Sequence, residues 1–156
     1  MFAEAPYLFS IAGLSVTLAG FAGLVSAFRR GGEWAPMDLF RLREIAEFGL
    51  GNALITLSMI PLATTTDMPT AIRTAAALGV LFIVGGAAIL TRRSRELALP
   101  ADRSWYWLPA IVDVAAIAPG LVAIITQSIG AFEFEILFML ARPMIVFVLV
   151  LGALRR

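Results

Sequence analysis

The sequence predicts an all-α membrane protein built from five transmembrane helices, and three observations support this fold class. Of its 156 residues, 60% are hydrophobic, whereas a soluble domain is usually about 45–50% apolar. The excess is arranged as five long apolar blocks, each long enough to cross a bilayer as a helix. Arginines gather at alternate joints between the blocks, as in membrane proteins that insert with a defined orientation.

We expect a single transmembrane domain with spans at residues 7–28, 45–63, 71–90, 105–126 and 132–154. Residues 29–44 form the longest polar joint, which we expect to extend the second span into the cytoplasm as a helix. The alternative for this joint is a separate helix that lies flat on the membrane surface. A four-span topology is also an alternative, but it would lose the alternation of the arginines.

The distribution of arginine predicts the orientation of the chain. With five spans, Arg142 falls inside the membrane, and only Arg73 lies near the side that also holds the N-terminus. The positive-inside rule therefore places the N-terminus outside the cell and the C-terminus in the cytoplasm. The opposite side collects Arg29, Arg30, Arg41, Arg43, Arg92, Arg93, Arg95, Arg103, Arg155 and Arg156.

Small residues at helical spacing indicate faces where helices pack together. Small side chains let two helices approach closely in lipid, where packing drives their association. We therefore expect helix contacts at six positions in spans one, three and four: Gly13, Gly20, Gly23, Ala75, Gly79 and Gly120.

Polar side chains near mid-membrane form the candidate functional centre. A guanidinium at that depth costs roughly 2.5–3.5 kcal/mol on insertion scales, so Arg142 should face protein or water. Asp113 differs from Arg142 by about 6 Å in predicted height, which is within reach of an arginine. We therefore expect an ion pair between Asp113 and Arg142, with Asn52 nearby. Glu135, seven residues before Arg142 on the same helix face, is the alternative partner.

This polar centre has two interpretations that the sequence leaves open. The small and polar residues that follow Asp113 would line a narrow path, in which Asp113 relays an ion or a proton. The same residues would equally form a packing groove for a neighbouring helix, with Asp113 neutralised by Arg142. Glu133 and Glu135, near the outer end of the fifth span, would form an external cation site or simply be solvated.

The composition removes several kinds of chemistry. The chain has no cysteine and no histidine, which removes disulfides, thiol nucleophiles and metal ligation by either residue. The sequence motifs of common hydrolases and of nucleotide-binding loops are also missing. A net charge of +1 gives no reason to expect a nucleic-acid partner. We therefore expect no enzyme activity, no cofactor and no metal site, with the lipid bilayer as the main partner.

Residues 19–30 (AGFAGLVSAFRR), followed by Trp34, Asp38 and residues 40–43 (FRLR), resemble small multi-pass bacterial membrane proteins that carry no functional assignment. The resemblance implies a location in a bacterial inner membrane and implies no activity. We expect a structural or accessory subunit that packs with itself or with a larger membrane complex. The alternative is a small transporter or channel subunit that uses the polar centre.

Overall fold

The computed structural model describes residues 3–28, 36–97 and 103–153, and within these ranges it contains helices and no strand. Each helix includes a stretch long and apolar enough to cross a membrane. The prediction of an all-α protein with five such helices is therefore confirmed. The helices are α1 (Ala5–Phe28), α2 (Pro36–Thr65), α3 (Met68–Glu96), α4 (Arg103–Thr126) and α5 (Ile129–Ala153).

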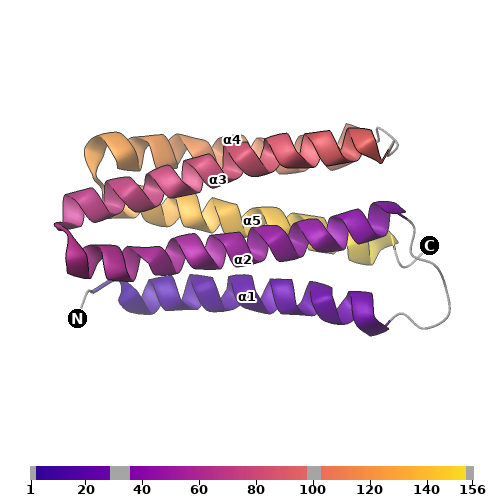
Figure 1. Cartoon of the computed structure of the whole chain (residues 1–156), viewed down its shortest axis with the longest axis horizontal. Helices are drawn as coiled ribbons and strands as arrows, with labels where there is room; N and C mark the ends of the chain where they lie inside the picture. Colours follow the sequence, from indigo (N-terminus) through magenta and orange to yellow (C-terminus); the bar gives the residue numbers. More distant parts are fainter. Residues whose placement is uncertain (1–2, 29–35, 98–102, 154–156) are drawn as a thin grey trace.

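The five helices run antiparallel to their neighbours in the chain and form one elongated bundle (Figure 1). α2 and α5 make up its centre, α1 packs mainly against α2, and α3 and α4 cover the other side. The α2–α3 and α4–α5 turns lie at one end of the bundle (Figure 1). We call the other end, where α2 begins and α3 ends, the basic end, because it holds Arg41, Arg43, Arg92, Arg93 and Arg95.

The turn between α2 and α3 is short because α3 has a well-formed cap. The carboxylate of Asp67 accepts a hydrogen bond from the backbone N–H of Thr70 at 3.1 Å, and a proline follows in the first turn of the helix. Hydrogen bonding from Thr70 favours the ionised carboxylate, and it holds the pKa of Asp67 below its usual value. The cap starts α3 at Met68, with only Thr66 and Asp67 between it and the end of α2 at Thr65.

α2 is longer than the span that the sequence predicted, because it already begins at Pro36. A proline suits the first turn of a helix, where its missing N–H is not needed. Arg41, Leu42 and Glu44 are buried against the bundle, so this part of the predicted cytoplasmic joint belongs to the bundle itself. The helix continues without a break, which excludes a separate helix lying flat on the membrane. Residues 29–35 of the joint lie outside the described residues.

α1 and α2 approach each other closely at Gly49. A Cβ atom added to Gly49 would lie 2.7 Å from the backbone oxygen of Ser15 and 3.2 Å from the Cβ atom of Ala19. Such short distances leave no space for a larger side chain at this position. Ser15 and Ala19 are themselves small and buried, so small residues on both helices produce the contact.

Three of the predicted packing glycines face away from the bundle. Gly13, Gly20 and Gly23 on α1 are exposed, and a Cβ atom added to any of them would meet no atom within 4 Å. They therefore contact no other helix among the described residues, and their role in packing with a second copy or a larger complex stays a prediction. α1 carries small residues on two faces, and only the face of Ser15 and Ala19 is covered by α2.

Candidate functional site

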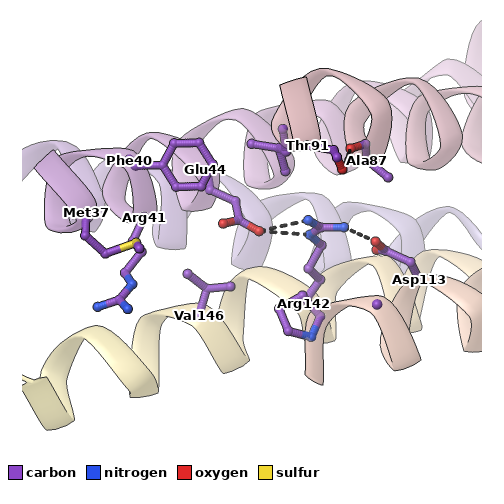
Figure 2. Close-up of a pocket in the computed structure, with 12 residues that line it drawn as sticks. Met37, Phe40, Arg41, Glu44, Ala87, Thr91, Asp113, Arg142 and Val146 are labelled. Atoms are coloured by element: carbon purple, nitrogen blue, oxygen red, sulfur yellow. Dashed lines mark hydrogen bonds and ion pairs between the residues drawn. The ribbon is translucent and has the colours of Figure 1, made fainter. Parts of the chain in front are cut away.

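The charged centre of the bundle is Arg142 on α5, whose guanidinium extends between α2 and α4 (Figure 2). Its Nη1 donates a hydrogen bond to Oδ2 of Asp113 on α4. Its Nε and Nη2 donate to the same oxygen of Glu44 on α2, at 3.2 Å and 2.8 Å. The guanidinium carbon also lies 3.8 Å from the centroid of the Phe48 ring. Two carboxylates and one aromatic face thus surround the buried positive charge.

Asp113 and Arg142 meet in the structure, whereas Asn52 lies elsewhere. The side-chain amide of Asn52 donates to the hydroxyl of Ser15 at 3.0 Å and to the carbonyl oxygen of Ile136 at 3.2 Å. It therefore ties α2 to α1 and to α5, and the prediction that it lies beside Arg142 is wrong. Asn52 is about 12 Å further along α2 than the carboxylate residue of that helix that pairs with Arg142.

That residue is Glu44, which sequence reasoning did not assign to the site. It was placed in the polar joint before the second span, where a charged residue needs no internal partner. The helical pattern contained a signal, because Glu44 falls among Phe40 and Phe48 on an otherwise apolar face. The side chain is only 10% exposed, and Arg142 is the partner that makes its burial tolerable.

A pocket of about 120 Å³ lies beside the cluster, between α2, α3, α4 and α5. Figure 2 shows Glu44, Arg142 and Asp113 in a row along it, with Met37, Phe40 and Arg41 on the side of Glu44 away from Asp113. Thr91 lies across from Arg142 (Figure 2). The pocket thus runs from the basic end of the bundle to the buried charges. Its remaining lining residues are mainly apolar: Ala87, Leu90, Pro109, Ala110 and Val146.

Two acids and two arginines line the pocket: Glu44, Asp113, Arg41 and Arg142. Both acids contact the guanidinium of Arg142, whereas Arg41 lies 3.6 Å from Asp38, which does not line the pocket. The formal charges of the lining therefore balance, and Glu44 and Asp113 are the lining groups that can take up a proton or bind a small cation.

A further acid, Glu135, lies on the same helix about 10 Å from Arg142. Its side chain is fully buried, and neither carboxyl oxygen has a hydrogen-bond partner among the described residues. A Cβ atom added to Gly79 on α3 or to Gly120 on α4 would overlap this carboxyl group. Two of the predicted packing glycines therefore make room for Glu135, and the third covered position, Ala75, is buried on α3.

Two predictions about Glu135 are wrong. It does not pair with Arg142, whose carboxylate partners are Glu44 and Asp113. It is also not solvated near the outer surface, because its side chain points into the bundle and only Glu133 is partly exposed. The two acids therefore do not share an external cation site.

The sequence matches no protein-family model, and comparisons with curated proteins and with solved structures give no significant match. The candidate site is therefore assigned from the contacts of Glu44, Asp113 and Arg142 in this chain. Within the described ranges, no group of three or more acidic side chains lies close enough to hold a metal ion. The site offers buried carboxylates, which can bind a proton or a cation. Its one guanidinium, that of Arg142, binds the two carboxylates.

Proposed function

We propose that this chain is a multi-pass membrane protein that moves protons or small cations across its bilayer through the helix bundle. Five helices long and apolar enough to span a membrane support the location. The observation that carries the transport proposal is the pocket that runs from the basic end to Glu44, Arg142 and Asp113. Charged side chains are expensive inside a membrane, and those that are retained commonly line ion pathways.

Stability alone is a weak reason to retain this cluster. Replacing a buried group of ion pairs by apolar side chains of similar volume is often neutral or stabilising. A bundle that only needed to pack would fill the space beside Arg142 with apolar residues. Glu44 and Asp113 are the lining groups that can bind a proton or a small cation, which supports transport of either.

We further propose that the membrane is a bacterial inner membrane and that the basic end faces the cytoplasm. The arginines at that end support this orientation, since Arg73 is the only described arginine near the opposite end. Four further arginines that the orientation argument used lie outside the described residues: Arg29, Arg30, Arg155 and Arg156.

Reporter fusions test the orientation. A reporter fused after Glu96 or at the C-terminus should be active in the cytoplasm, and one inserted at the α2–α3 turn beside Asp67 should be active in the periplasm. A C-terminal reporter that is active only in the periplasm would refute the five-span topology.

Ion flux in proteoliposomes tests the function. We expect an imposed proton or cation gradient to dissipate through the wild-type protein, and flux to fall towards that of empty liposomes in Asp113→Asn and in Glu44→Gln. Both changes preserve side-chain volume but remove a negative charge beside the pocket. Glu96→Gln is the control, because Glu96 pairs with Arg92 in an exposed position at the helix end. Flux that is absent from the wild type, or equal in all four proteins, contradicts the proposal.

A structural or accessory role is the second candidate function, and the outer face of α1 favours it. Gly13, Gly20 and Gly23 are exposed and meet no other part of the described chain. Glycines on the lipid-facing side of a helix allow another helix to approach closely. We propose that a second copy of this chain, or a larger membrane complex, would pack on this face.

A further inference from the structure

The environment of Glu135 makes an ionised carboxylate costly there. An isolated buried carboxylate loses its hydration without gaining a counter-charge, a cost of several kcal/mol. The carboxyl group is fully buried, and neither of its oxygens has a bonding partner among the described residues. The neutral acid carries no charge to desolvate, so it is the form that this environment stabilises.

The space around this carboxyl group is provided by two helices. Gly79 on α3 and Gly120 on α4 both lie against its Oε1 atom, and any larger residue at either position would overlap it. Glycine inside a helix is less favourable than alanine. Both α3 and α4 therefore carry an unfavourable helix residue at the position that lies against the carboxyl group of Glu135.

The ionisable groups on the surrounding helices do not reach Glu135. Arg73 Nε donates to the carbonyl oxygen of Ile124 at 3.3 Å, and the hydroxyl of Tyr7 donates to the carbonyl oxygen of Glu133 at 3.4 Å. Glu44 and Asp113 are paired with the guanidinium of Arg142. The ionisable groups in question are Tyr7 on α1, Glu44 on α2, Arg73 on α3, Asp113 on α4 and, on α5 itself, Glu133 and Arg142.

An apolar layer separates Glu135 from the cluster at the pocket. Ile83 on α3, Ala116 on α4 and Met139 on α5 are buried in the same hydrophobic cluster. They lie one helical turn from Gly79, Gly120 and Glu135, on the side towards the basic end. Glu135 is about 9 Å from the start of α5 at the opposite end of the bundle. Ala75, Ala123 and Phe132, all fully buried, form a matching apolar layer on that side. The opposite end is nevertheless the nearer end of α5, because the basic end is about 27 Å away along the helix.

We propose that Glu135 is a proton-binding site that exchanges one proton with water at the end of the bundle opposite the basic end. On release, the O–H bond of the neutral acid breaks, its electron pair stays on the carboxylate, and the proton passes to a water molecule to give hydronium. Uptake is the reverse step. This inference rests on the proposed function and narrows its ion to the proton.

The number of available oxygens favours a proton over a metal cation. Hard metal ions such as Ca²⁺ take about six to eight oxygen ligands. Glu135 offers two unpartnered oxygens, and the facing positions are glycines without side-chain ligands. A proton needs a single oxygen atom.

Infrared spectroscopy of the intact protein in liposomes at neutral pH tests the site directly. We expect a carbonyl band from a protonated carboxyl group that shifts when the protein is labelled with ¹³C-glutamate, which separates glutamate from aspartate without any substitution. Glu135→Gln should abolish this band, and Glu133→Gln should leave it, because Glu133 is partly exposed. Glu135→Asp, which keeps an acid, provides a further test if Glu135→Gln does not fold: its band should lose the ¹³C-glutamate shift.

Two of the glycines on α3, Gly79 and Gly85, provide a matched pair of variants. Gly79→Ala places a methyl group against the carboxyl group of Glu135, so we expect the band to move or to disappear. Gly85→Ala adds the same methyl group to the same helix where a Cβ meets nothing within 4 Å, so the band should not change. Equal responses to the two variants would show that Gly79 does not provide the space for the carboxyl group of Glu135.

The outcomes separate this inference from the proposed function. A band that depends on Glu135 in a protein without ion flux supports the proton site and refutes transport. Proton flux that persists in Glu135→Gln, with no protonated glutamate in the wild type, refutes the proton site and leaves transport standing. Cation flux without proton flux, together with an ionised Glu135, also overturns the inference.

Discussion

Arg142→Ala is expected to lower the stability of the protein in mild detergent by about 3–5 kcal/mol, because it leaves buried carboxylates without their counter-charge. Glu44 and Asp113 are 10% and 13% exposed, so water screens neither of them well. Glu44→Ala and Asp113→Ala should each cost less than the loss of Arg142, since the guanidinium keeps one carboxylate partner. Thermal and denaturant unfolding of the purified variants measures these differences.

The triple variant Arg142→Met, Glu44→Gln and Asp113→Asn tests whether an orphaned charge is the cause. It removes all three charges, so we expect it to be more stable than Arg142→Ala and much more stable than additivity predicts. Arg92→Ala is the control for loss of an ion pair at the surface. Its side chain is 83% exposed beside Glu96, and exposed pairs contribute about 0–1 kcal/mol. Strictly additive losses would show that the three groups do not act as one cluster.

Gly49→Leu is expected to give the second largest loss of stability, because the α1–α2 contact has no space for a side chain. The first added carbon would already lie 2.7 Å from the backbone oxygen of Ser15, and a backbone atom cannot move aside as a side chain can. Forcing extra volume into a packed interface typically costs about 1–3 kcal/mol. Thermal unfolding in detergent should therefore occur at a clearly lower temperature than for the wild type.

Gly20→Leu is the matched control, since it places the same side chain on the exposed face of α1. We expect thermal unfolding close to that of the wild type. If a second copy packs on this face, the mass of the protein in mild detergent should also fall in Gly20→Leu and stay unchanged in Gly49→Leu. Equal destabilisation by Gly20→Leu and Gly49→Leu would be inconsistent with the arrangement of α1 described above.

The helical class and the five apolar helices could be predicted from the sequence, because both depend on local composition. A continuous apolar block determines a long helix whatever it packs against. The contact between Asp113 and Arg142 could also be anticipated, since depth along two neighbouring spans limits which charges can meet. The spacing of small residues predicted helix contacts at Gly79 and Gly120, although not that the carboxyl group of Glu135 would lie against both.

The tertiary structure alone decided which face of each helix is covered. α1 carries small residues on two faces, and hydropathy cannot separate them in a chain whose outer surface is also apolar. The sequence places Glu44 in a cytoplasmic extension of the second span, whereas in the structure this part of α2 packs in the bundle and Glu44 contacts Arg142. Glu135 was assigned to the surface because it lies near a helix end. Burial of a side chain depends on the rotation of its helix relative to four others, which is set by packing between segments distant in sequence.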